Sequence, residues 1–145
     1  DLDEIPNPKK ISNFKKEDKY VCFVQGNFLL KFNLLNVSEP KWYGTRMCRK
    51  KDLKSPQWLR EIKAKKIPFY KFYKPKFDKF IENGGWHFSS VKDAKGIYEI
   101  IKRKIDQKKD LFDRNYNFKV VEIDNTFPKY IYENKEIFKE LLYEN

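Results

Sequence analysis

At 145 residues the chain is long enough for one domain with a buried core, and its aromatic content of 17% is too high for a disordered protein. No run approaches the roughly 20 apolar residues of a membrane-spanning helix, so no membrane span is expected. The net charge of +11 raises the question of nucleic acid, but 27 of the 32 basic residues are lysine. Because proteins that read base sequence depend on arginine, the composition argues against nucleic-acid recognition.

The chain opens with an acidic motif, Asp1-Leu2-Asp3-Glu4-Ile5-Pro6. In an extended segment alternate side chains share a face, so we expect Asp1 and Asp3 to point the same way while Leu2 faces inward. Two carboxylates on one face repel each other unless a cation lies between them, and oxygen ligands suit Mg²⁺, Mn²⁺ or Ca²⁺. The motif alone therefore fits either a metal site or a solvated acidic segment.

Local signals in the first half of the chain predict short helices and strands. Asn7 before Pro8 and Ser55 before Pro56 are favourable helix starts, so helices are expected over 8–16 and 56–63. Apolar, β-branched and aromatic runs predict strands over 20–24, 27–35 and 42–48. We expect a break at Gly26 between the first two strands, and the third strand antiparallel to the one before it.

The second half is predicted to contain two strands and two longer helices. The predicted elements are a strand over 86–89 after the Gly84-Gly85 turn, a helix over 92–109, a strand over 120–123 and a helix opening at Thr126. The expected buried stripe of this last helix is Ile131, Ile137, Phe138, Leu141 and Leu142. Between 63 and 80 lysines alternate with aromatics, which suits a stacking platform for bases or sugars or a loop with inward-packed aromatics.

The chain contains one histidine, His87, and two cysteines, Cys22 and Cys48. A single histidine excludes a histidine-rich zinc site. The cysteines have no metal-ligand spacing and are expected to be free thiols in apolar surroundings.

Several segments, taken in order, resemble family-17 glycosyltransferases, the β-1,4-N-acetylglucosaminyltransferases. The most specific parts of this resemblance are the acidic motif and Gly84-Gly85-Trp86-His87-Phe88-Ser89. The matching segments are Asp1–Pro8, Phe28–Asn33, Trp42–Thr45, Leu59-Arg60, Gly84–Ser89, Asp110–Arg114 and Ile123–Tyr130. The resemblance spans nearly the whole chain and corresponds to the C-terminal portion of the family's catalytic domain, because the family's nucleotide-binding half precedes the acidic motif.

The resemblance implies an α/β fold of the GT-A type, a Rossmann-like α/β/α sandwich, here as one unit over 1–145. It also implies Mn²⁺ or Mg²⁺ held against the diphosphate of a UDP-sugar, whose N-acetylglucosamine or related sugar passes to a glycan acceptor with inversion. Ligands of open sheets bind at the carboxyl ends of strands, which agrees with an acidic motif at such an end.

Carried over to this chain, the resemblance assigns roles to a small set of residues. Asp1 and Asp3 become metal and ribose–diphosphate residues, and His87 either completes the metal shell or is structural. Arg60 binds phosphate or forms a surface salt bridge, and Trp86 is an acceptor-sugar platform or a core residue. Glu4 either joins the metal site or favours the helix that follows it. Glu82 and Asp93 flank the Gly-Gly-Trp-His segment and are the acids best placed by sequence to act as general base; the alternative is that each is a solvated residue.

Two other functions remain open at this stage. A basic, aromatic-rich module could bind nucleic acid or polysaccharide without catalysis, with an affinity for nucleic acid that falls steeply with salt. A degenerate glycosyltransferase could instead serve as a protein scaffold. The catalytic hypothesis differs from the binding module because it requires binding of a divalent metal and UDP, and from the scaffold because it requires turnover of the UDP-sugar.

Overall fold

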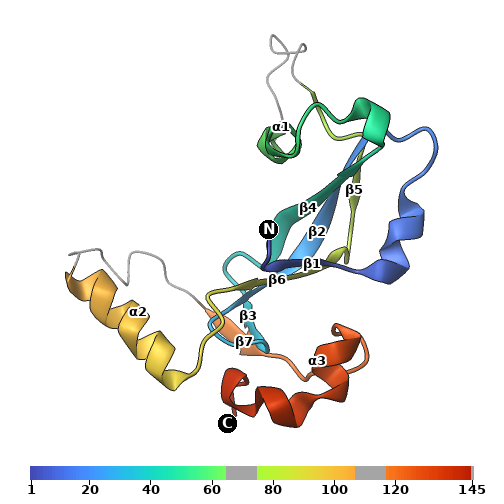
Figure 1. Cartoon of the computed structure of the whole chain (residues 1–145). Coiled ribbons are helices and arrows are strands. Elements are labelled where there is room, and N and C mark those ends of the chain that lie inside the picture. The colour runs from blue at the N-terminus through green and yellow to red at the C-terminus, as the bar shows by residue number, and fades with distance from the viewer. Residues whose placement is uncertain (65–74, 107–116, 145) are drawn as a thin grey trace.

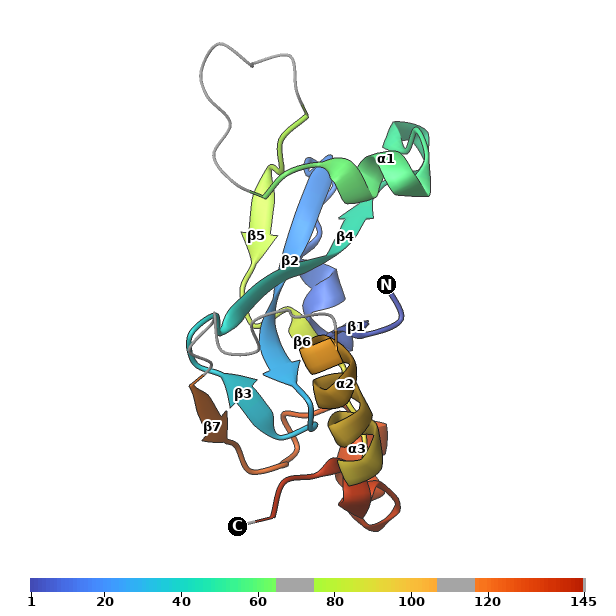
Figure 2. The ribbon, with the colours of Figure 1, turned by 90° about the vertical axis from the view of Figure 1, so that its left-hand side faces the viewer.

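The computed structural model describes residues 1–64, 75–106 and 117–144. These residues form a mixed α/β fold built on a seven-stranded mixed sheet, which confirms the expected α/β class. Figures 1 and 2 show α1 (Pro56–Glu61) at one end of the long strand β2 (Tyr20–Leu29) and α3 (Lys129–Glu133) near its other end. No helix among the described residues is long and apolar enough to cross a membrane.

The long strand β2 is the centre of the sheet and pairs with four other strands. Antiparallel neighbours lie along one of its edges and parallel neighbours along the other. The remaining strands are β1 (Glu4–Pro6), β3 (Leu34–Asn36), β4 (Lys41–Cys48), β5 (Lys79–Ile81), β6 (Gly85–Ser89) and β7 (Phe118–Val120). Strand β1 lies antiparallel beside β6, and β7 antiparallel beside β3.

The break expected at Gly26 is wrong, because β2 runs unbroken through this residue. Gly26 pairs with Lys41 of β4 on one side and with Trp86 of β6 on the other. These ladders on both edges hold the backbone extended, and the chain turns only at Leu30, which has a φ of 68°. Tertiary pairing therefore overrides the local tendency of glycine to interrupt a strand.

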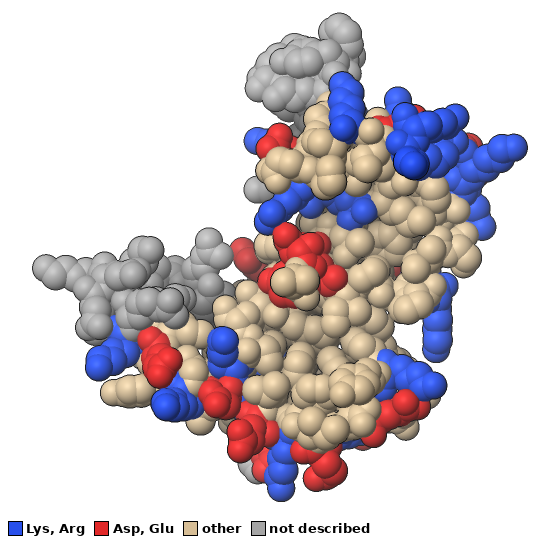
Figure 3. Space-filling model, in the orientation of Figure 1, with Lys and Arg blue, Asp and Glu red and all other residues tan. Residues whose placement is uncertain are grey.

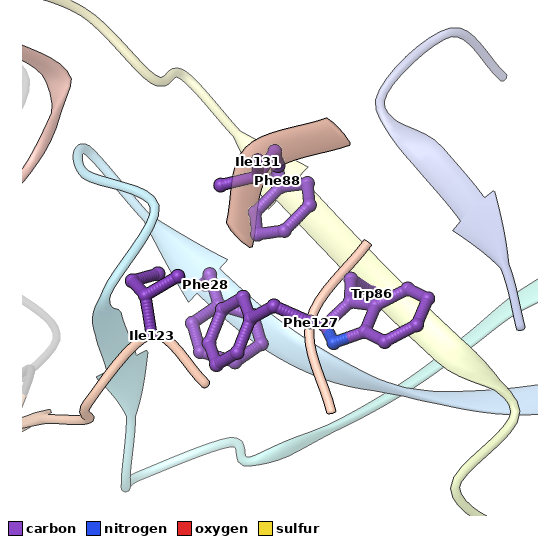
Figure 4. Close-up of a cluster of buried hydrophobic side chains, with 6 residues drawn as sticks. All are labelled: Phe28, Trp86, Phe88, Ile123, Phe127 and Ile131. Carbon is purple, nitrogen blue, oxygen red and sulfur yellow. The ribbon is translucent and has the colours of Figure 1, made fainter. Parts of the chain in front are cut away.

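Where β2 pairs with β6, the two faces of the sheet differ in chemistry because successive side chains of a strand alternate between them. Phe28, Trp86 and Phe88 lie on one face, and the C-terminal segment packs Phe127 and Ile131 against them. Figure 4 shows this buried cluster, with the labelled side chains pointing toward one another. The intervening residues of β2 and β6 point to the other face, which is polar.

The Gly84-Gly85 pair allows β6 to lie close to its neighbours. Gly85 has a φ of +140°, and a Cβ there would lie 2.1 Å from the carbonyl oxygen of Ile5. A Cβ on Gly84 would lie 2.7 Å from the Ile81 carbonyl oxygen and 2.8 Å from the Phe23 Cβ. A side chain at Gly85 would therefore push β6 away from β1, and one at Gly84 would push the turn away from β2 and β5.

The predicted helix starts at Asn7 and Ser55 are confirmed. The Asn7 side chain accepts a hydrogen bond from Lys9 N at 3.1 Å, and Ser55 Oγ accepts one from Trp58 N at 3.1 Å. The first helix is a 3-10 helix over Pro8–Asn13 rather than a longer α-helix. A further 3-10 helix spans Lys50–Asp52.

In the last third of the chain, the helix expected over 92–109 is α2 (Ala94–Asp106). The strand expected over 120–123 lies slightly earlier, as β7.

The final helix is divided into α3 and a 3-10 helix over Lys135–Leu141. Ile131 is buried, but Ile137 is 69% exposed, so its place in the buried stripe is wrong. The division of the helix rotates Ile137 away from the sheet.

Two sequence features lie outside the described residues. Most of the aromatic residues expected to alternate with lysine between 63 and 80 lie in 65–74, and the segment 110–114 lies in 107–116. Within the described part, both cysteines are free, as expected. Burial raises the pKa of the Cys22 thiol to about 11.

Candidate functional site

A cavity of about 680 Å³ lies over the face of the sheet that carries Asn27 and His87, and most of the charged side chains in its lining are acidic. Its charged lining residues are Asp1, Asp3, Glu4, Glu39, Arg60 and the ionisable His87. In Figure 3 an acidic patch occupies the position of the N-terminus in Figure 1, with basic residues gathered above it. A chain with a net charge of +11 thus places four carboxylates around one cavity, an arrangement that attracts cations.

The floor of the cavity is a row of polar residues across four neighbouring strands. His87 on β6 lies opposite Glu4 on β1 and beside Asn27 on β2. Asn36 on β3 continues the row, since the pairing of Phe28 with Leu35 places Asn36 opposite Asn27. Directly paired residues share a face of the sheet, so the strand register brings these side chains together.

The acidic motif reaches this floor through a turn rather than through the expected extended segment. Glu4 N donates to Asp1 O at 3.3 Å, and Leu2 is completely exposed instead of facing inward. The expectation for Leu2 is therefore wrong, because alternation applies only within a strand and β1 begins at Glu4. Asp1 and Asp3 nevertheless line the same cavity.

Asp3 and His87 form the most direct contact within the predicted site. Asp3 Oδ2 lies 3.4 Å from His87 Nε2, and the His87 side chain is 7% exposed. Burial lowers the pKa of His87 from its usual value, while the nearby carboxylates of Asp3 and Glu4 oppose this shift. The net direction favours the neutral imidazole at neutral pH.

Asn27 determines which nitrogen of His87 carries the proton. Asn27 Nδ2 donates to the Glu39 carbonyl oxygen at 2.9 Å, and a carbonyl can only accept. This fixes the orientation of the amide, so Asn27 Oδ1 faces His87 Nδ1 at 3.0 Å and must accept from it. The neutral ring therefore holds its proton on Nδ1 and presents the lone pair of Nε2 to the Asp3 carboxylate.

A lone pair facing a carboxylate is repulsive unless a cation or a proton lies between them. An imidazole nitrogen and a carboxylate oxygen are both ordinary ligands of divalent transition metals. Donors on adjacent positions of an octahedral ion, each about 2.1 Å from it, lie about 3 Å apart, close to the 3.4 Å observed. Asp3 and His87 thus fit two positions of a Mn²⁺ or Mg²⁺ site, with the imidazole favouring Mn²⁺.

The expected third ligand, Asp1, lies farther from such a site. Asp1 Oδ2 forms an ion pair with Arg60 at 3.0 Å, and the two side chains are 35% and 59% exposed. No group of three or more His, Cys, Asp or Glu side chains that could hold a metal occurs in the described part of the chain. Because exposed ion pairs contribute little energy, Asp1 and Arg60 remain free to exchange partners.

Trp42, to which the sequence assigned no role, completes the wall of the cavity together with Glu4. Trp42 on β4 stacks on the His87 ring, with centroids 4.1 Å apart and planes inclined by 7°. Trp42 Nε1 donates to Glu4 Oε1 at 2.9 Å, and the Glu4 side chain is 6% exposed. Glu4 therefore positions the wall of the cavity, and the signal that identifies Trp42 is its strand register rather than its sequence motif.

The remaining predicted site residues lie elsewhere. Trp86 is 9% exposed and belongs to the hydrophobic cluster on the opposite face. Glu82 lines a second, larger groove on that face together with Trp86, and its carboxylate pairs with Lys41 at 3.0 Å. Asp93 Oδ1 accepts from Gly96 N at 2.7 Å, so it caps the start of α2. None of these three residues lines the acidic cavity.

Comparisons of the chain with protein-family models, with curated proteins and with solved structures found no match. The residues of the cavity and the sequence resemblance are therefore the basis for assigning a function.

Proposed function

We propose that this chain is part of a metal-dependent, inverting glycosyltransferase of GT-A-like fold, which transfers N-acetylglucosamine or a related sugar from a UDP-sugar to a glycan acceptor. The observation that carries the proposal is the contact of Asp3 with the lone-pair side of His87 in an open acidic cavity. The resemblance of the acidic motif and of the Gly-Gly-Trp-His-Phe-Ser segment to family-17 glycosyltransferases supports the same function.

In this proposal Asp3 and His87 hold Mn²⁺ or Mg²⁺, while Asp1 lines the same cavity in its ion pair with Arg60. A bound divalent ion supplies charge neutralisation for a diphosphate leaving group. Arg60 reaches into the same cavity and binds a phosphate oxygen when it exchanges its partner Asp1. Asn27 keeps the imidazole in the required tautomer, as the outer partners of metal-bound histidines do.

The general base that removes the acceptor's proton is proposed among the carboxylates of the cavity rather than at Glu82 or Asp93. Glu39 fits this role best, because hydrogen bonds fix its backbone on both sides. Its carbonyl accepts from Asn27 Nδ2, and its N–H donates to Asn36 Oδ1 at 3.3 Å. In an inverting displacement the acceptor hydroxyl attacks from the side opposite the leaving group. A carboxylate that lines the cavity on a fixed backbone, and that does not belong to the Asp3–His87 pair, meets this positional requirement.

The proposal is tested by thermal unfolding with Mn²⁺ and UDP. If UDP with Mn²⁺ is supplied at about 100 times its dissociation constant, binding should add about 2.7 kcal/mol, or roughly 5–10 °C in Tm for a chain of this size. Asp3→Asn and His87→Gln should abolish this shift. Glu17→Gln serves as the charge control, because Glu17 is exposed and does not line the cavity.

The outcome against the proposal is a Tm that Mn²⁺ and UDP leave unchanged. If short nucleic acids bind instead, with an affinity that falls steeply with salt, the basic binding module is the better description. Binding of Mn²⁺ and UDP without transfer of sugar to any glycan would favour the scaffold hypothesis.

A further inference from the structure

Trp42 is a large aromatic residue on the wall of the acidic cavity, and its side of the sheet is set by its register. It lies opposite Gln25 in the antiparallel pairing of β4 with β2, and Gln25 shares the face of Asn27 by alternation. Trp42 is 38% exposed, in contrast to the tryptophan that the sequence favours as a sugar platform, Trp86, which is buried on the other face.

The orientation of the Trp42 ring is fixed before any ligand arrives. One face of the indole stacks on His87 at 4.1 Å between centroids, and the Nε1 edge donates to Glu4 Oε1 at 2.9 Å. The surface that remains exposed therefore belongs to the outer face and the opposite edge. An aromatic ring held in this way loses little conformational freedom when a ligand binds.

The other residues that line the cavity indicate the class of ligand. The cavity presents carboxylates of Asp1, Asp3 and Glu39, which accept hydrogen bonds from hydroxyl groups. An exposed aromatic face favours a flat apolar surface, and a pyranose combines one face of C–H groups with a rim of hydroxyls. An anionic ligand lying against these carboxylates with no cation between them would be repelled, whereas a neutral sugar would not.

We infer that the outer face of Trp42 binds a pyranose ring of the glycan acceptor. The acceptor role rests on the proposed function, whereas the binding of a neutral sugar to this face does not. Because Trp42 covers His87, a sugar on its outer face lies one ring thickness away from the Asp3–His87 pair and toward solvent, where the rest of a glycan can extend.

The test uses the fluorescence of the three tryptophans, Trp42, Trp58 and Trp86. Chitobiose, a neutral disaccharide, is titrated into the wild-type chain, and acyclic sorbitol is titrated in parallel as a polyol control. Chitobiose should change the emission and sorbitol should not. Trp42→Phe should lose the emission change, whereas Trp58→Phe should keep it, because Trp58 lies on α1 against Tyr20 and outside the cavity.

Affinity is then measured by calorimetry or by NMR titration. Removal of an aromatic stacking surface in Trp42→Ala should weaken chitobiose binding by about tenfold. Trp42→Phe retains a ring and should recover most of this loss, which a merely structural defect would not do. In Trp42→Phe, whose ring can still stack on His87, UDP affinity in the presence of Mn²⁺ should fall by less than chitobiose affinity falls in Trp42→Ala, so the two ligands report on separate parts of the cavity.

Chitobiose quenching that persists in Trp42→Phe would overturn the inference, as would a complete lack of response to chitobiose in the wild type. An emission from Trp42 that changes with UDP but not with chitobiose would also overturn it, because the ring would then bind the nucleotide. Failure of the proposed function is distinguishable from these results, since it removes the response to Mn²⁺ and UDP while the chitobiose response of Trp42 remains.

Discussion

The substitution Gly85→Ala should strongly destabilise the fold. Gly85 has a φ of +140°, and a side chain in such a sparsely populated region costs about 1–3 kcal/mol. A Cβ would also lie 2.1 Å from the Ile5 carbonyl oxygen, so β1 must move away from β6. Losing about two hydrogen bonds of this ladder adds about 1–3 kcal/mol, which gives a total of roughly 4 kcal/mol.

Urea unfolding followed by circular dichroism measures this loss. With a slope of about 2 kcal/mol per molar urea, the midpoint of Gly85→Ala should fall by about 2 M. Gly26→Ala is the matched control, since its Cβ would meet a ring atom of Phe28 at 2.8 Å rather than backbone. The Phe28 ring can shift, so the midpoint of Gly26→Ala should fall by less than about 0.5 M.

The same substitution should affect the candidate site, because β1 carries the acidic motif beside His87. Phe88 N donates to the Asp3 carbonyl oxygen at 2.8 Å, so displacement of β1 moves Asp3 away from the imidazole. We expect Gly85→Ala to lose the thermal response to Mn²⁺ and UDP at temperatures where it is still folded. Equal midpoints for Gly85→Ala and Gly26→Ala would refute the structural reasoning.

Three further outcomes follow from individual contacts. In long-range ¹⁵N–¹H NMR spectra, the single imidazole should show the Nδ1-protonated neutral form, and Asn27→Leu should convert it to a mixture of tautomers; an Nε2-protonated ring in the wild type would contradict the assignment. Glu39→Gln should reduce kcat by about 10²–10⁴-fold and leave UDP affinity unchanged, and an unchanged kcat would exclude Glu39 as base. Burial raises the pKa of Cys22 to about 11, and since the unfolded thiol ionises first, stability should fall between about pH 9 and pH 11 by roughly 1 kcal/mol per pH unit. The measurement is the difference in unfolding free energy between wild type and Cys22→Ala at each pH, which isolates this slope. A difference that does not change with pH would show that the thiol does not stay protonated in the folded chain.

Local sequence signals predict those parts of the fold that depend on neighbouring residues. The capping side chains of Asn7 and Ser55 form the expected hydrogen bonds, and alternating strand residues predict β4 and β6 to within one residue. The continuity of β2 through Gly26 was not predictable, because it depends on ladders to strands that are 15 and 60 residues away. The exposure of Ile137 likewise depends on where the last helix divides.

The candidate site shows the same limit. The acidic motif and His87 could be identified from their chemistry and their order, and the fold brings Asp3 and His87 together. Asn27 and Trp42 could not be identified from the sequence as site residues, because an asparagine in an apolar strand or a tryptophan in an edge strand has no distinctive local signal. Their roles arise only when β4 and β6 are paired with β2 in a defined register.

The alternation of side chains in β6 separates structure from function over four consecutive residues. Trp86 and Phe88 face the hydrophobic cluster, whereas His87 and Ser89 line the cavity. A slip of one residue in the register would expose both aromatics and bury the imidazole among Phe28, Phe127 and Ile131, where its ring nitrogens would lack partners. The apolar cluster thus fixes the register that places His87 opposite Glu4 and beside Asn27. For this reason the aromatic residues that stabilise the sheet also determine the geometry of the proposed metal and sugar site, although they touch neither ligand.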